Sequence, residues 1–365
     1  MEKQWTVLVI NPGSTSTKLA VFQGAEPLFV EEMRYSAEDI GRYKTIIDQK
    51  DFRHQSVLAA MAKHDFDPKR LDAVVGRGGL LKPLKGGTYA ISDEMINDLS
   101  ALRFGAHASN LGAIIAREIA SPLGIPCFIA DPVSVDEMIP VARITGLPEM
   151  EWFSRWHALN LRAIARRAGK DLGGSFQDFN FVMVHLGGGV TVAALEGGRC
   201  IDVNNALDGG GPMSPERSGS LPTGQLLEMC FSGEFTKDEI RKKLAGKGGL
   251  VAHLGTNDGR QIEKMIQGGD EHATLVYQAL AFQLAKEIGG AAASLKGDVR
   301  AIVITGGLAH QKRLIDWIEE YVRWIAPVMV YPGEDELLAL AQGAFRVLEG
   351  EEKPLDYATR EPVLA

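Results

Sequence analysis

Two short apolar runs, each ending at glycine or hydroxyl residues, dominate the hydrophobic pattern of the chain. Residues 7–10 read V-L-V-I and are followed by N-P-G-S-T-S-T-K. Residues 181–186 read F-V-M-V-H-L and are followed by three glycines and a second run, V-T-V-A-A-L. Runs this short, rich in β-branched residues and bounded by turn residues, predict strands rather than helices. Each place is therefore predicted to be a strand, a tight turn and a returning strand.

The pattern after each hairpin predicts buried strands alternating with helices. In the first half the expected strands are two within 19–33, 71–76 and 125–130, and the expected helices lie within 39–64, 92–102 and 111–120. In the second half a strand R-C-I-D-V opens a long loop over 199–219, and later strands are expected at 301–304 and 328–331. Helices are expected up to 244, over 274–295 and over 336–348. Because the order repeats, the chain is predicted to hold two copies of one mixed α/β plan, with Gly13 and Gly187 in corresponding turns.

Length and composition agree with two domains and exclude several functions. The 365 residues exceed one ordinary core, and a net charge of −8 argues against a nucleic-acid surface. Cys127, Cys200 and Cys230 have no C-x-x-C spacing and are expected to be free thiols in a reducing compartment. No signal peptide is recognised, and no apolar run approaches the ~18 residues that a membrane span needs. A cytoplasmic location is expected.

The segment N-P-G-S-T-S-T-K has the composition of a phosphate-binding turn. Small residues after a strand leave backbone N–H groups accessible, and Asn11, Ser14, Ser16 and Lys18 add side-chain donors and positive charge. The spacing of a Walker A loop is absent. A merely polar hairpin tip is the alternative.

Two arginines and several acids and histidines are further candidates. Arg77 and Arg217 lie in the glycine-containing segments R-G-G and E-R-S-G, and a guanidinium meets phosphate or carboxylate oxygens in pairs. A surface salt bridge is the alternative for each of them. Asp131 ends a buried apolar run, the place from which a carboxylate points into the ligand site of an open α/β sheet. The histidines lack the spacing of a metal site.

Together these segments resemble the acetate and butyrate kinase family. Its two signatures are similar, in the same order, to V-L-V-I-N-P-G-S-T-S-T-K and V-M-V-H-L-G-G-G-V-T-V. The segment N-P-G-S-T-S-T-K and the chain length resemble those of the butyrate kinases. The resemblance implies two duplicated ribonuclease-H-like domains of the actin-like ATPase fold with a central cleft. The implied domains are 1–135 plus 337–365 on the carboxylate and phosphoryl side, and 136–336 on the nucleotide side. It also implies a homo-oligomer, at least a dimer.

The resemblance implies roles for individual residues. Arg77, Arg217, Asp131 and His157 are expected to be catalytic, with the two arginines flanking the transferring phosphoryl. ATP and its phosphates are expected at Asn11, Ser14, Ser16, Lys18, His185, Gly187, Gly189, Gly306 and Gly307, with the adenosine against 305–308 and 202–211. The acid pocket is expected at Gly78, Gly79, Ala106 and His107, although His107 could simply cap a helix. Mg²⁺ is expected at Glu336, the acid of the second domain, and at Asp131 or through their waters; Glu334 and Asp335 are alternatives to Glu336.

The implied activity is transfer of the ATP γ-phosphoryl to butyrate, giving butyryl phosphate and ADP, with Mg²⁺. Gly78, Gly79 and Ala106 are smaller than their counterparts in acetate kinases and are expected to widen the pocket, whereas Trp156 is larger. Acetate, propionate or a branched acid are the alternative substrates, because one methylene is worth only about 1–3 kcal/mol in discrimination. A nucleotide-dependent binding module or a sugar kinase of the same fold is the alternative class.

Overall fold

The computed structural model describes residues 3–207 and 210–358, and their contacts divide them into two units. The first unit holds residues up to Val135 and those from Asp335 onward, and the second holds Asp136–Glu334. The boundary near the end of the chain falls before Asp335, two residues earlier than expected. Glu336 therefore belongs to the first unit and not to the second.

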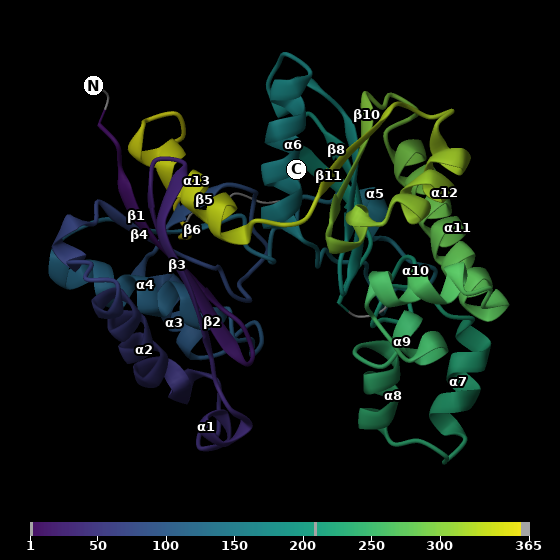
Figure 1. Cartoon of the computed structure of the whole chain (residues 1–365), viewed down its shortest axis with the longest axis horizontal. Coiled ribbons are helices and arrows are strands. Elements are labelled where there is room, and N and C mark those ends of the chain that lie inside the picture. Colours follow the sequence, from purple (N-terminus) through teal and green to yellow (C-terminus); the bar gives the residue numbers. More distant parts are fainter. Residues whose placement is uncertain (1–2, 208–209, 359–365) are drawn as a thin grey trace. The chain divides into compact units, whose positions relative to one another are not determined.

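The first unit is built on one mixed sheet (Figure 1). Its strands are β1 (Thr6–Pro12), β2 (Ser16–Gln23), β3 (Glu26–Arg34), β4 (Ala73–Gly76), β5 (Thr88–Ala90) and β6 (Cys127–Ala130). Their order is β3-β2-β1-β4-β6-β5, with β1, β2 and β3 antiparallel and β1, β4 and β6 parallel. The parallel strands end at the same edge, where the β1–β2 turn, Arg77 and Asp131 follow them.

The sheet of the second unit repeats this plan. It contains β7 (Phe181–Leu186), β8 (Val190–Glu196), β9 (Arg199–Val203), β10 (Ala301–Gly306) and β11 (Val328–Pro332). Read from its other edge, the order β9-β8-β7-β10-β11 matches β3-β2-β1-β4-β6, and the strand directions match as well. Asn11 pairs with Lys18 across one hairpin, and His185 pairs with Thr191 at the same level of the other. The predicted duplication is confirmed.

Helices cover both faces of each sheet. The first unit contains α1 (Ala37–Gly41), α2 (Lys50–Lys63), α3 (Asp93–Ser100), α4 (Asn110–Leu123) and α13 (Glu336–Leu348). The second contains α5 (Pro140–Arg143), α6 (Ala158–Asp171), α7 (Thr223–Phe231), α8 (Lys237–Leu244), α9 (Gly249–Leu254), α10 (Gly259–Gln267), α11 (Glu271–Ser294) and α12 (Lys312–Val322). Short 3₁₀ turns lie at η1 (Ile47–Gln49), η2 (Pro68–Arg70), η3 (Phe176–Asp178) and η4 (Gly307–His310).

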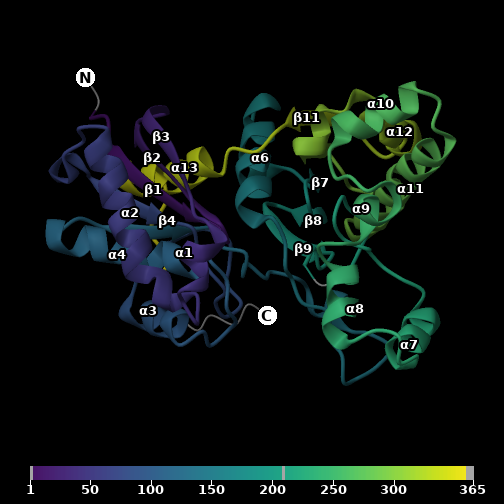
Figure 2. The same cartoon turned by 60° about the horizontal axis from the view of Figure 1, so that its bottom comes forward.

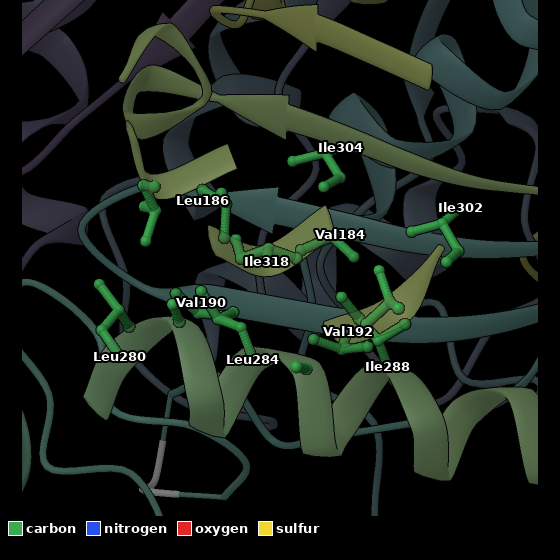
Figure 3. Packing of buried hydrophobic residues seen from close by; sticks show 14 of the residues in the cluster. Val184, Leu186, Val190, Val192, Leu280, Leu284, Ile288, Ile302, Ile304 and Ile318 are labelled. Atoms are coloured by element: carbon green, nitrogen blue, oxygen red, sulfur yellow. The ribbon is translucent and has the colours of Figure 1, made fainter. Parts of the chain in front are cut away.

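Successive side chains of a strand point to opposite faces of the sheet and therefore pack against different helices. Leu8 and Ile10 of β1 belong to the apolar cluster shared with α2 and α4, whereas α13 packs on the opposite face, with Gly343 against Ala130. In the second unit, Val184 of β7 and Val192 of β8 pack with α11 and α12 (Figure 3). The strands read as continuous apolar runs because both faces are buried.

The sequence pattern located most elements but not all of them. The predicted N-cap is confirmed at Ser92, whose hydroxyl accepts a hydrogen bond from the backbone N–H of Met95 at 3.2 Å. No helix was predicted at α5, α6, α9, α10 or α12, whereas the predicted strand R-C-I-D-V is confirmed as β9. Helices α7 and α8 lie away from the sheet of the second unit in both views (Figure 2), and no residue of α7 is buried. Among the described residues, no helix is long and apolar enough to cross a membrane.

Candidate functional site

The β1–β2 turn carries the hydroxyl-rich segment at the edge of the first sheet. It is closed by the Gly13 N–H, which donates to the Ser16 carbonyl at 2.8 Å, and Ser14 and Thr15 are exposed. Asn11, at the end of β1, donates from Nδ2 to Glu336 Oε2 at 2.7 Å. The turn thus presents small polar residues to solvent, with Asn11 bound to an acid at the start of α13.

Arg77 follows β4 and forms an ion pair with the same acid, Glu336. Its backbone N–H donates to the Ile10 carbonyl at 2.8 Å, and its backbone lies against Gly112 of α4, where a Cβ would come within 2.8 Å of the Arg77 nitrogen. The residue expected to bind metal and the arginine expected to bind phosphoryl are therefore in direct contact. This brings Asn11, Arg77 and Glu336 together in one unit.

Gly78 and Gly79 do not open a pocket, contrary to the expectation. A Cβ on Gly78 would lie 2.5 Å from Cβ of Pro132, and a Cβ on Gly79 would lie 2.5 Å from Cα of Asn110. These positions are filled by the protein itself, so the glycines allow the chain to pass close to α4 and to the residues after β6. Any room for a longer acid must come from other positions, such as the exposed Ala106.

Asp131 is buried and holds the loop before β5. Its Oδ1 accepts from the Gly87 N–H at 2.7 Å, and its own N–H donates to the Gly87 carbonyl at 2.9 Å. Its backbone has φ 38°, in the left-handed region that non-glycine residues seldom adopt. Backbone strain of this kind persists where surrounding contacts hold the conformation, and here the two hydrogen bonds to Gly87 do so.

His107 precedes α4 and is held by Ser109. Its Nδ1 lies 2.7 Å from Ser109 Oγ and accepts from the Ser109 backbone N–H at 3.2 Å, which leaves Nε2 to carry the proton of the neutral ring. Desolvation, and secondarily the charge of Arg77, lower the pKa of His107 below its usual value. At neutral pH the ring is therefore uncharged and offers one N–H donor.

The pKa of His107 should respond to Arg77 in a defined direction. In Arg77→Gln it should rise, because a repulsive charge is lost, but stay below the usual value of about 6.5 because desolvation is the larger cause. NMR titration of the His107 ring in both proteins measures this. A pKa unchanged by the substitution would show that the two groups do not interact.

A pair of stacked histidines lies at the head of the second sheet. The rings of His157 and His185 are 3.9 Å apart between centroids, and His185 is buried. His185 Nδ1 lies 2.8 Å from Nδ2 of the buried Asn160, and His157 Nδ1 lies 2.8 Å from Oγ1 of Thr191. Since the Asn160 amide donates to Nδ1 of His185, the ring carries its proton on Nε2. A Cβ on Gly187 would lie 2.6 Å from that nitrogen, so this donor faces the glycine turn.

Arg217 lies over the same glycine turn. A Cβ on Gly189 would lie 2.6 Å from Cζ of Arg217, and the guanidinium donates to the Ala206 carbonyl. The loop that carries Arg217 is tied to the turn by Ser214, whose hydroxyl donates to the Gly188 carbonyl at 2.7 Å. The second unit therefore brings together His185, His157, Arg217 and the turn 187–189, all of which were candidates from the sequence.

A cavity of about 730 Å³ opens beside this turn, large enough for a nucleotide. Its lining includes Gly187, Gly188, Gly307, Leu308, Glu334 and residues 257–260. The segment 257–260 was not singled out from the sequence. Its G-T-N-D-G-R composition marks a turn at a helix start, and only the fold places it opposite the glycine turns.

The loop 202–211, expected beside the adenosine, lines a different cavity. Asp202, Asn204 and Gly211 border a space of about 390 Å³ together with Trp152 and Glu287. Asp208 and Gly209 of this loop lie outside the described residues. Two segments were predicted to hold the adenosine, 305–308 and 202–211. Only the first of them lines the cavity beside the glycine turn 187–189, through Gly307 and Leu308.

The two glycines after β10 should respond differently to substitution. Gly306 has φ 95°, and a Cβ there would lie 2.7 Å from backbone atoms of Leu186, whereas a Cβ on Gly307 would meet nothing within 4 Å. Gly306→Ala should therefore lower the free energy of unfolding by about 2 kcal/mol or more, and Gly307→Ala by less than about 0.5 kcal/mol. Urea unfolding of both variants tests this, and equal effects would contradict the close approach at Gly306.

The acids do not form a preassembled metal site. Among the described residues, no group of three or more His, Cys, Asp or Glu is placed to hold a metal ion. Glu336 accepts from Arg77 on Oε1 and from Asn11 on Oε2, so the cluster of Asn11, Arg77 and Glu336 contributes a single carboxylate. Such a set fits Mg²⁺, which keeps several waters and is bound through one or two carboxylates and substrate phosphates.

The sequence of the second unit matches a known family. Residues 155–318 match the model of the acetokinase family. This segment contains His157, His185, the turn 187–189, Arg217 and residues 257–260, so the site of the second unit lies within the acetokinase match. Asn11, Arg77, Asp131 and Glu336 lie outside it.

Solved acetate and propionate kinases have the same fold over nearly the whole chain. The acetate kinase of Porphyromonas gingivalis is 20% identical, with a TM-score of 0.77 over 94% of this chain and 100% of that one. A propionate kinase from Francisella tularensis is 18% identical, with a TM-score of 0.72 over 93% of this chain and 98% of that one. The acetate kinase of Entamoeba histolytica is 16% identical, with a TM-score of 0.73 over 93% of this chain and 99% of that one. These likenesses confirm the predicted actin-like ATPase fold.

Proposed function

We propose that the protein transfers the γ-phosphoryl of ATP to a short-chain carboxylate, giving an acyl phosphate and ADP. The observation that carries the proposal is the arrangement at the head of β7. There the Arg217 guanidinium and the His185 Nε2–H both face the glycine turn 187–189, and Gly187 and Gly188 of this turn line a cavity of about 730 Å³. Donors gathered on a glycine turn suit the anionic oxygens of a phosphate chain.

The proposed reaction asks little covalent chemistry of the protein. The acid is ionised at neutral pH, so its oxygen attacks the γ-phosphorus without a general base, while the bond to the β-phosphate oxygen breaks and ADP leaves. Charge on the transferring group is neutralised by Arg217 and by the N–H donors of His185 and His157, all of the second unit. Glu336 and Asp131 are the acids proposed to hold Mg²⁺ through water, and the ion would supply positive charge to the phosphates when bound.

Butyrate is the proposed acid, with propionate, branched acids and acetate as the alternatives within the same reaction. The preference rests on the likeness of the first signature to butyrate kinases and on the small residue Ala106. Gly78 and Gly79 lend it no support, because the space beside them is filled. Overlap among neighbouring acids is expected, since one methylene discriminates by only about 1–3 kcal/mol.

The test is acyl phosphate formation with Mg·ATP, trapped as the hydroxamate, across acids of increasing length from acetate to valerate. The highest kcat/KM at butyrate or isobutyrate would support the full proposal. A maximum at acetate or propionate would keep the carboxylate kinase and overturn the choice of acid. ATP binding without turnover of any acid would overturn the kinase and favour a nucleotide-dependent binding module.

A further inference from the structure

Arg53 of α2 is completely buried behind the β1–β2 turn and is bound mainly to it. Nη1 donates to the carbonyls of Gly13 at 2.7 Å and Ser16 at 2.9 Å and to Thr17 Oγ1 at 3.1 Å, and Nη2 donates to the Ser14 carbonyl at 3.0 Å. Nε and Nη2 also donate to Gln49 Oε1, at 3.0 and 2.8 Å. The guanidinium lies 4.9 Å from the centre of the Tyr35 ring. One side chain thus binds three successive parts of the turn.

The charge of Arg53 is not neutralised by an acid. All its hydrogen-bond partners in the described chain are carbonyl, amide or hydroxyl oxygens. Within the same residues, Arg53 forms no ion pair with a carboxylate. Desolvation lowers the pKa of Arg53, but a guanidinium stays protonated at neutral pH. A buried cation balanced only by dipoles costs folding free energy. Its position directly behind a candidate anion site suggests that it serves that site.

The contacts of Arg53 also determine which way the peptide groups of the turn point. The carbonyls of Gly13, Ser14 and Ser16 face the guanidinium, and a peptide N–H points opposite to the carbonyl of its own unit. The Ser14 N–H, which shares a peptide with the Gly13 carbonyl, and the Thr15 N–H, which shares one with the Ser14 carbonyl, are therefore directed away from Arg53. Neither donates to another group of the described chain, and both residues are exposed. Two adjacent N–H groups directed outward form the kind of concavity that binds phosphate oxygens.

We propose that Arg53 is a positioning residue that holds the Ser14 and Thr15 N–H groups toward a phosphoryl oxygen and adds its buried charge to their attraction. The inference rests on the proposed function for its kinetic consequence, but the phosphate site at the turn is a property that can be measured without turnover. Hydrogen bonds from the guanidinium polarise the carbonyls of the turn and strengthen the N–H groups of the same peptides as donors. A lysine would supply the charge at one point and could not reach both the Gly13 and Ser14 carbonyls and Gln49 together.

The experiment compares wild type, Arg53→Lys, and the matched control Arg117→Lys. Arg117 of α4 also binds a backbone carbonyl, that of Ile91 at 2.7 Å, but it lies among residues of α3 and α4 and has no contact with the turn. The first readout is the backbone amide NMR spectrum during titration with inorganic phosphate. In wild type and Arg117→Lys the Ser14 and Thr15 amides should shift with phosphate, and in Arg53→Lys the apparent dissociation constant should rise at least about tenfold.

The second readout separates positioning from stability. Arg53→Lys should lower kcat for acyl phosphate formation about 10- to 50-fold at a temperature where it is fully folded, with the KM for the acid nearly unchanged, while Arg117→Lys stays within about twofold. In Arg53→Ala, added guanidinium should restore part of the activity and of the Ser14 shift, whereas equal ionic strength from sodium chloride should not. Should Arg53→Ala fail to fold, the Arg53→Lys comparison decides alone.

Two results would overturn the inference. Wild-type amides of Ser14 and Thr15 that do not move with phosphate would remove the site itself. Phosphate binding in Arg53→Lys equal to wild type would show that the arginine serves stability alone. Phosphate shifts in a wild-type protein that phosphorylates no acid would instead keep the inference and overturn the proposed function.

Discussion

Replacing Arg217 by alanine should lower kcat for acyl phosphate formation about 10³-fold, the largest effect expected of any single substitution in this chain. The guanidinium lies directly over the turn 187–189, beside the cavity proposed for the nucleotide. In the proposed reaction its charge would neutralise the phosphoryl group in transit, where negative charge spreads over three oxygens. The KM for ATP should change much less than kcat, because the interaction is strongest in the transition state.

Two further variants complete that measurement, Arg217→Lys as a comparison and Arg323→Ala as a control. Lysine keeps the charge but loses the paired donors, so Arg217→Lys should recover only a small part of the activity. Arg323 is exposed just after α12 and is not one of the candidate residues, so its removal should leave kcat within about twofold. Activity of Arg217→Ala within a few-fold of wild type would remove this arginine from the reaction.

Gly189→Ala should lower kcat about 100-fold without unfolding the protein. The φ of Gly189 is one that alanine can adopt, but the new Cβ would lie 2.6 Å from Cζ of Arg217. The end of a long side chain moves at little cost to folding, so the guanidinium should be displaced from the turn while the melting temperature changes by only a few degrees. The loss of activity would then come from misplacing Arg217 and not from loss of structure.

The neighbouring glycine supplies the matched control. A Cβ on Gly188 would approach Glu216 Oε2 no closer than 3.6 Å, which is ordinary contact, so Gly188→Ala should keep most of the activity. A crystal structure of Gly189→Ala should show Arg217 moved away from the turn. Full activity in Gly189→Ala, or equal loss in both variants, would contradict the packing of Arg217 on Gly189.

The sequence predicted those parts of the fold that repeat a local pattern. The two hairpins, their corresponding turns and the apolar strands were marked by short apolar runs, most of which end at glycine. Arg217 and His185 could be singled out because each lies within or next to a glycine-rich segment of a recognisable signature. These features are local, so a few consecutive residues are enough to indicate them.

The remaining features depend on contacts between distant segments. The sequence of α2 gives no signal that singles out Arg53, and only the fold places this residue behind the β1–β2 turn. Gly78 was interpreted as space for substrate, although its missing side chain makes room for Pro132. Glu336 was assigned to the second domain from the resemblance, but it lies in the first unit, bound to Asn11 and Arg77. Sequence order alone could not distinguish these possibilities.

The most direct test of the proposed reaction is ³¹P NMR of the wild-type protein with Mg·ATP and butyrate labelled with ¹³C at the carboxyl carbon. The account predicts a new phosphorus signal coupled to that carbon, growing as the γ-phosphate signal of ATP falls and ADP appears. This coupling arises only if phosphorus and the carboxyl carbon share an oxygen. The formation of ADP and inorganic phosphate alone, with butyrate and equally with labelled acetate or propionate, would contradict phosphoryl transfer to a carboxylate.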